Sequence, residues 1–117
     1  KKIPKLNSNI QPIIGLVEDT LDDFLKKHNP KINFVHFDMD TYSPTKFTLE
    51  KIKPYLIKDS ILIFDEATNS LDSNTEDQIM NSIKKLKSEL SIIIISHNSN
   101  CLKICDEIID LDEKSAK

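Results

Sequence analysis

Short runs of consecutive apolar residues, separated by longer amphipathic segments, set the pattern of this chain. The runs lie at residues 32–37, 61–64 and 92–95, with two further candidates at 13–17 and 108–111. The runs at 61–64 and 92–95 are continuous, and Asn33 and His36 interrupt the run at 32–37 without a regular alternation. Continuous apolar runs of this length are typical of strands that are covered on both faces of a parallel sheet.

The segments between the runs have the periodicity of helices. The first carries Leu21, Phe24, Leu25 and His28 at positions i, i+3, i+4 and i+7. The second begins with Ser43-Pro44, an N-cap followed by proline at the first helical position. The third begins with the capping-box pattern Ser73-Asn74-Thr75-Glu76. The inward-facing residues are expected to be Phe47, Ile52, Tyr55 and Leu56 in the second helix, and Ile79, Ile83, Leu86 and Leu90 in the third.

Strands that alternate with helices predict βαβ units with right-handed crossovers. We therefore expect one α/β domain over residues 1–117, with three layers and four to five mostly parallel strands. Helices should lie on both faces of the sheet. This is the architecture of a Rossmann-like or P-loop-like half domain.

Composition and charge exclude several classes of protein. The 117 residues carry 16 basic and 19 acidic side chains, a formal net charge of −3. No basic stripe suggests a nucleic-acid partner. No apolar run approaches the roughly 20 residues needed to cross a bilayer, and the first residues lack the apolar core of a signal peptide. We expect a cytoplasmic protein with no direct membrane insertion, and reduced thiols at Cys101 and Cys105.

Five titratable residues follow the central runs. Asp38 and Asp40 come after the first strand, Asp65 and Glu66 after the second, and His97 after the third. Ligands of parallel α/β sheets bind beyond the carboxyl ends of the strands. Acids at such ends can also simply cap the next turn, but five groups at three strand ends favour a site. Adjacent carboxylates suit Mg²⁺, and a second acid can accept a proton from water.

The other two histidines have structural interpretations. His36 lies within a predicted strand and is expected to be a hydrogen-bonded core residue. His28 lies at a predicted helix end, where it can interact with the helix dipole.

From about residue 58 to 113 the chain resembles the C-terminal part of an ABC-transporter ATP-binding cassette. The motifs are ILIFDE at 61–66, like the Walker B strand, and ATNSLD at 67–72, like the segment that runs into the D-loop. SIIIISH at 91–97 resembles the strand and switch histidine, and CDEIIDL at 105–111 resembles the next strand. Asn98 departs from the family, which usually has arginine there.

This resemblance implies a role for four residues. Asp65 would hold Mg²⁺, and Glu66 would activate the attacking water. Asp72 would face a partner cassette, and His97 would contact the γ-phosphate of ATP. The implied partners are a second copy of the chain or the other subunits of a membrane transporter.

From about residue 13 to 66 the chain resembles a different family, the metal-dependent macrocin and sugar O-methyltransferases. The motifs are GLVEDTLDDFL at 15–25, FVHFDMDTYSPTKFTLEKIKPYL at 34–56 and SILIFDE at 60–66. In this family Asp38, Asp65 and Glu66 would bind a divalent metal. Asp40 would be the base that deprotonates the hydroxyl of a sugar or another small-molecule acceptor, with S-adenosylmethionine as the methyl donor.

The two resemblances overlap at residues 61–66, so the chain looks like a hybrid of a methyltransferase-like half (1–60) and a cassette-like half (61–117). With Gly15 as its one glycine, it has no glycine-rich loop for ATP or S-adenosylmethionine. Our leading hypothesis is a cassette-like fragment that is inactive until missing segments are supplied. The alternatives are an O-methyltransferase fragment, and a non-catalytic remnant or interaction module.

Overall fold

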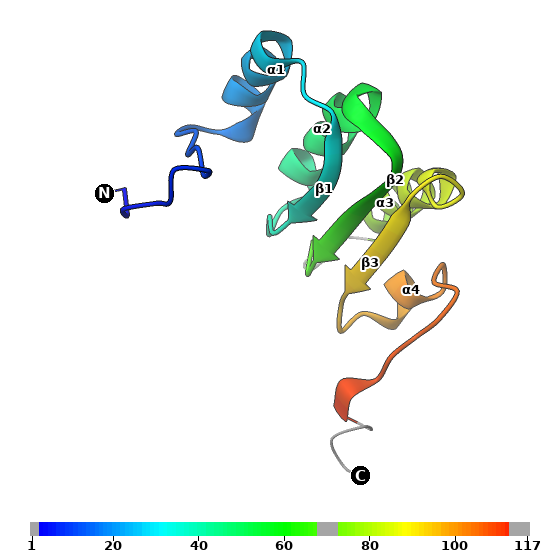
Figure 1. Ribbon diagram of the computed structural model, residues 1–117. Coiled ribbons are helices and arrows are strands. Elements are labelled where there is room, and N and C mark those ends of the chain that lie inside the picture. Colours follow the sequence, from blue (N-terminus) through cyan, green and yellow to red (C-terminus); the bar gives the residue numbers. More distant parts are fainter. Residues whose placement is uncertain (1–2, 68–72, 113–117) are drawn as a thin grey trace.

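The computed structural model describes residues 3–67 and 73–112 and shows a three-stranded parallel sheet with helices packed on it (Figure 1). The strands are β1 (Ile32–Phe37), β2 (Leu56–Asp65) and β3 (Ser91–Ile95). The helices are α1 (Val17–His28), α2 (Tyr42–Ile52), the 3₁₀ turn η1 (Lys53–Tyr55), α3 (Ser73–Leu86) and α4 (Ser99–Leu102). The predicted α/β class is confirmed, with three strands in the described residues.

The sheet has the order β1-β2-β3, and both pairings are parallel. Phe37 of β1 lies beside Phe64 of β2, which lies beside Ile94 of β3. The rings of Phe37 and Phe64 stack with their centroids 4.6 Å apart. The register of β1 against β2 shifts between Ile32 and Phe34, and from Phe34 onward the pairing is regular. Because the strands are parallel and aligned over this second part, their carboxyl ends meet at one edge of the sheet.

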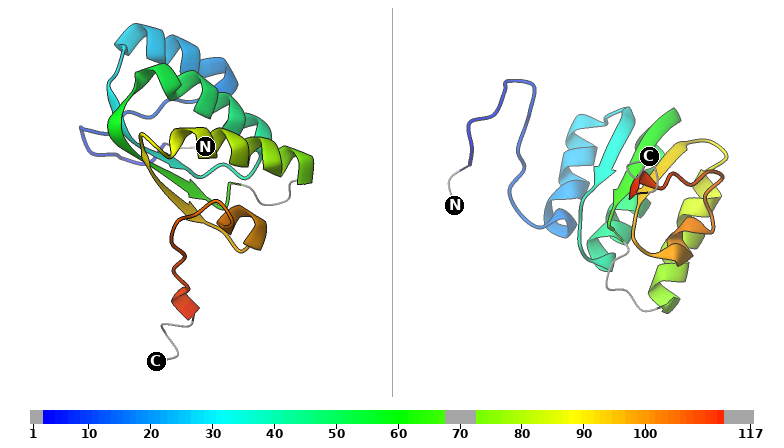
Figure 2. Two further views of the ribbon diagram at one scale, coloured as in Figure 1. Left: turned by 90° about the vertical axis from the view of Figure 1, so that its right-hand side faces the viewer. Right: turned by 90° about the horizontal axis from the view of Figure 1, so that it is seen from below.

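One face of the sheet packs against helices α2 and α3. Leu62 and Phe64 point to this face and are fully buried, as are Leu49 of α2 and Ile79 and Ile83 of α3. Ile79 and Ile83 of the predicted inward face of α3 are thus confirmed, whereas Leu86 is half-buried and Leu90 lies beyond the end of the helix. Figure 2 shows that α1, α2 and α3 all lie on the same side of the strands.

The opposite face of the sheet is open in the described part of the chain. Phe34, Ile61, Ile93 and Ile95 point to it and are 39–55% exposed. The continuous apolar runs led us to expect cover on both faces. Along β3 the burial instead alternates between exposed and half-buried residues.

Two short apolar runs are not strands. Residues 13–16 form an extended arm before α1, and residues 106–110 have no regular structure. Ile14, Ile108 and Ile109 are 59–71% exposed. A strand forms only where its backbone pairs with a neighbour, and these segments have no neighbouring strand to pair with among the described residues. Apolar content alone therefore overpredicted the strand count.

The second helix begins two residues earlier than expected. Thr41 is its N-cap and Pro44 is its third residue, so Ser43 is not the cap. Its buried face consists of Thr45, Thr48, Leu49 and Ile52. Phe47 is only half-buried, with the Lys51 ammonium 5.4 Å from the centre of its ring.

Both cysteines are free thiols in the structure. Burial raises the pKa of the Cys105 thiol, and the negative charge of Asp106 raises it further, against an opposing effect of Lys87. No helix in residues 3–67 and 73–112 has the length and apolarity needed to span a membrane.

Replacing Leu62 by alanine should lower the free energy of unfolding by about 2–5 kcal/mol, because a fully buried side chain in the central strand is lost. The matched change Ile93→Ala on the open face should cost about 1 kcal/mol or less, mainly through strand propensity. Urea titration followed by circular dichroism measures both. Equal losses would mean that the face described as open is covered in solution.

Candidate functional site at the carboxyl edge of the sheet

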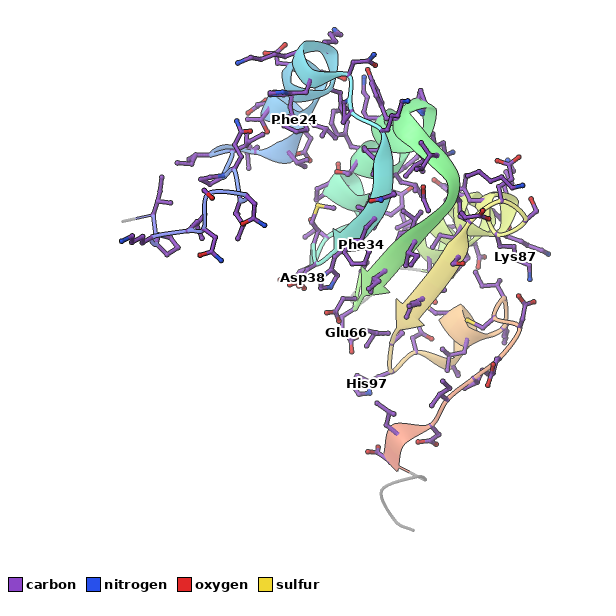
Figure 3. All side chains as sticks on the ribbon, viewed as in Figure 1. Phe24, Phe34, Asp38, Glu66, Lys87 and His97 are labelled. Atoms are coloured by element: carbon purple, nitrogen blue, oxygen red, sulfur yellow. The ribbon has the colours of Figure 1, made fainter. Side chains whose placement is uncertain are left out.

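The carboxyl edge of the sheet brings residues from three strands together. Asp38 directly follows β1, Asp65 ends β2, Glu66 follows it, and His97 lies two residues beyond β3. Figure 3 shows Asp38, Glu66 and His97 one after another along this edge. The parallel pairing of the three strands places these residues at the same edge.

Glu66 and His97 are in direct contact. The Nε2 atom of His97 lies 3.3 Å from Oε1 of Glu66, which is an ion pair whenever the imidazole is protonated. The side chain of His97 is 95% exposed and that of Glu66 is 28% exposed. The backbone N–H of Glu66 donates to the carbonyl of Ile95 over 2.9 Å, so Glu66 is fixed against β3 as well as β2.

The second carboxylate oxygen of Glu66 has a different environment. Oε2 is buried and has no hydrogen-bond partner among the described residues. A buried carboxylate oxygen without a partner is costly, since it has lost its hydration without compensation. This atom is therefore an unsatisfied acceptor next to the edge among the described residues.

The backbone of Glu66 lies in the left-handed region, with φ of 54°. Only glycine adopts this region at no cost, and strained backbone of this kind is concentrated at functional sites. The conformation turns the chain sharply from β2 into Ala67, which is buried at 2% exposure. The turn keeps the Glu66 side chain at the edge of the sheet.

Asp65 pairs with His36 on the open face of the sheet. Oδ2 of Asp65 lies 3.2 Å from Nε2 of His36, and the two side chains are 32% and 45% exposed. His36 is thus hydrogen-bonded as expected, but it is not a core residue. Its position in β1 points away from the helices, because it is paired with Ile63 and not with the buried Leu62.

The remaining predicted site residues are not joined to this pair. Asp38 and Asp40 are exposed, and the ion pairs at this edge in the described residues involve Asp65 and Glu66 instead. Residues 3–67 and 73–112 contain no group of three or more His, Cys, Asp or Glu side chains arranged to hold a metal. The ligand set of Asp38, Asp65 and Glu66 stays a prediction. Asp72 lies outside the described residues.

Glu76, next to this edge, has contacts that the sequence pattern did not predict. Glu76 was expected to complete a capping box at the start of α3. Glu76 is 5% exposed, and its Oε1 accepts hydrogen bonds from Asn98 Nδ2 (2.8 Å) and Cys101 Sγ (3.1 Å). The capping box itself stays a prediction, because the described contacts do not test it. The sequence did not indicate the contacts with Asn98 and Cys101, since a glutamate in the first turn of a helix is also favourable as a cap or beside the helix dipole.

Comparison with known proteins supports one of the two resemblances. The chain is 35% identical over 60 residues to a probable ABC transporter ATP-binding/permease protein of Haemophilus influenzae, a match that covers 51% of this chain and 11% of that protein. It is 46% identical over 59 residues to the lactococcin-G-processing and transport ATP-binding protein LagD of Lactococcus lactis, covering 50% and 8%. Half of the chain is similar to ABC-transporter ATP-binding proteins.

A further relative, the methionine import ATP-binding protein MetN of Staphylococcus saprophyticus, is 44% identical over 52 residues, or 42% of this chain and 15% of that protein. The chain thus spans between 8% and 15% of the length of these three relatives. No family model and no solved structure matches the chain. The comparisons support the cassette-like half and give no support to the methyltransferase-like half, which stays a prediction.

Replacing Glu66 by glycine should give a protein about 1 kcal/mol more stable than the matched variant Glu66→Ala. Both variants remove the contact with His97, but only glycine adopts the positive φ of this position without strain. Urea unfolding of the two variants measures the difference. A more stable alanine variant would show that residue 66 is not in the left-handed region.

Proposed function

We propose that the chain carries the water-activating half of an ABC-type ATP-binding site. The observation that supports it best is the contact between Glu66 and His97, whose side chains come from neighbouring strand ends and lie 3.3 Å apart. The similarity of half of the chain to ABC-transporter ATP-binding proteins agrees with this assignment.

Glu66 is the proposed general base. Its Oε1 is engaged by His97, and its buried Oε2 has no partner in the described residues. The carboxylate is 28% exposed at the edge of the sheet, where it would accept a proton from a bound water molecule. General-base catalysis of this kind contributes about 10²–10⁴-fold to a rate.

Asp65 is the proposed magnesium ligand. Mg²⁺ usually takes one or two carboxylates together with phosphate oxygens and retained waters. The carboxylate of Asp65 is one-third exposed at the end of β2, and one of its oxygens is engaged by His36. The residues present thus fit an ion that arrives bound to a nucleotide, and they do not form a complete protein cage.

His97 is the proposed contact to the γ-phosphate. Its imidazole is almost fully exposed and borders Glu66, so it can donate a hydrogen bond to an anion beyond the edge. Asp72, in the segment that resembles the D-loop, is the proposed contact to a partner cassette. In this role the chain would work as a dimer, or as a subunit of a membrane transporter.

The cradle for the ATP phosphates has to come from elsewhere. Such a loop needs glycines whose backbone N–H groups surround the phosphates, and the chain holds a single glycine, Gly15, two residues before α1. We infer that a further segment, or another chain, supplies this loop. Alone, the chain should bind nucleotide weakly through Mg²⁺ and should not turn it over at a useful rate.

An O-methyltransferase fragment is the second candidate. It is favoured by Asp38, which lies at the same edge as Glu66 in Figure 3 and would complete a metal site with Asp65 and Glu66. Asp40 would then be the base that acts on a sugar hydroxyl. S-adenosylmethionine, like ATP, would need a glycine-rich turn from outside the chain. A non-catalytic remnant or interaction module is the third possibility, and it predicts that neither cofactor binds.

A chimera tests the role of Glu66 directly. In this chimera, residues 61–111 replace the matching segment of a purified ABC cassette. The cassette supplies the phosphate loop. The chimera should hydrolyse ATP, and Glu66→Gln should lower kcat about 10²–10⁴-fold while leaving ATP binding intact. Ser88→Ala, on the loop before β3 at the other end of the sheet, is the control. Full hydrolysis in the Glu66→Gln chimera would exclude Glu66 as the base.

The intact chain tests the metal and the cofactor. In calorimetric titrations Mg-ATP should bind with a Kd of about 1 mM, corresponding to about −4 kcal/mol, and S-adenosylmethionine should not bind. Asp65→Asn should weaken Mg-ATP binding about 10-fold or more, because the ion loses its carboxylate. Asp22→Asn, whose carboxylate pairs with Lys51 on the helical surface, is the matched control.

Submicromolar binding of ATP would contradict the inference that the phosphate cradle lies elsewhere. Binding of S-adenosylmethionine in place of ATP would favour the methyltransferase fragment.

A further inference from the structure

The loop that carries His97 is attached to α3 through one buried carboxylate. Glu76, in the first turn of α3, is 5% exposed and accepts a hydrogen bond from Asn98 Nδ2 over 2.8 Å. The same oxygen accepts a hydrogen bond from the thiol of Cys101, which is fully buried. Two residues that follow β3 therefore converge on a single acceptor in the preceding helix.

Asn98 is held on its other sides as well. Its Oδ1 accepts from the backbone N–H of Asn100 over 2.9 Å and caps α4, and its own N–H donates to Oγ of Ser96 over 3.0 Å. His97 lies between Ser96 and Asn98. The backbone on both sides of the histidine is thus fixed by polar contacts, with Asn98 at the centre of them.

The imidazole itself has little to hold it. It is 95% exposed, and its Nε2 contacts Oε1 of Glu66 at 3.3 Å. A side chain with so little packing can keep this position only if its backbone is held, because side-chain rotamers alone leave it free to swing into water. The polar contacts of the loop supply that restraint.

The burial of the Glu76 carboxylate costs free energy unless hydrogen bonds compensate for it. Burying a carboxylate requires hydrogen bonds that compensate for lost hydration. An exposed glutamate in the same first turn would serve the helix dipole without this cost. Among the described residues, the hydrogen bonds that offset this cost come from Asn98 in the His97 loop and from Cys101 in α4.

We propose that Glu76 is a positioning residue for His97, acting through Asn98. The hydrogen bond from Asn98 Nδ2 fixes the loop at residues 96–98, and this holds the imidazole against Glu66. The proposal rests on the proposed function only for what His97 does there. The hydrogen bond, the order of the loop and the contact with Glu66 exist without a nucleotide.

A swap of donor and acceptor isolates this hydrogen bond. Asn98→Asp has the same shape and still caps α4 with its oxygen, but it places a carboxylate against Glu76 and should release the loop. Glu76→Gln alone keeps an acceptor for Asn98 and should behave like the native chain. Glu76→Gln combined with Asn98→Asp restores the contact with the donor on α3. Asp77→Asn, exposed on the next residue of α3, is the control for the change in charge.

The measurements are the ¹⁵N order parameter of the His97 amide and the nuclear Overhauser contact between the His97 ring and the Glu66 side chain. In the native chain, Glu76→Gln and Asp77→Asn, the order parameter should be about 0.85. In Asn98→Asp it should fall below about 0.6, with loss of the Overhauser contact. The combined variant should recover both values.

Two results would overturn the proposal. In one, Asn98→Asp leaves the order parameter and the Overhauser contact unchanged, or lowers only the melting temperature, as a purely structural role predicts. In the other, the combined variant fails to recover them. Failure of the proposed function looks different: the chimera would then lack ATP hydrolysis with its native sequence, while the loop still responds to the swap.

Discussion

The parallel pairing of β2 with both of its neighbours is the constraint on which the rest of this structure depends. Because β1, β2 and β3 run in the same direction and in register, Asp38, Glu66 and His97 reach the same edge. The buried residues of β2, Leu62 and Phe64, hold this register by packing on α2 and α3. A slip of one residue in β2 would exchange its buried and open faces and would move Glu66 away from His97.

Within this edge, the two adjacent acids have separate environments. Asp65 is the last residue of β2 and pairs with His36 across the open face, whereas Glu66 turns away from the strand with a positive φ and meets His97. Adjacent residues in a strand would point to opposite faces. The left-handed turn at Glu66 instead ends the strand there. The Glu66 carboxylate lies beside His97 at the edge, while that of Asp65 stays beside His36 on the open face.

The sequence allowed the three central strands and the helices between them to be predicted, because their apolar runs are flanked by clear helical periodicity. It failed for residues 13–17 and 108–111, where apolar residues occur without a neighbouring strand. Whether an apolar segment becomes a strand depends on contacts between distant segments, which a local sequence pattern does not indicate. The same holds at the site. The strand-end acids and His97 were visible, but the hydrogen bond between Glu76 and Asn98 spans 22 residues and its local pattern indicated a helix cap.

The outer strand β3 has a consequence for how this chain behaves in solution. In the part of the chain that the structure describes it pairs with β2 on one side only, and it consists of one serine followed by four isoleucines. An edge strand with unpaired backbone groups, branched apolar side chains and no charge is a template for adding further strands. At high concentration such chains can associate edge to edge, so the amount of monomer in a sample will depend on how concentrated it is.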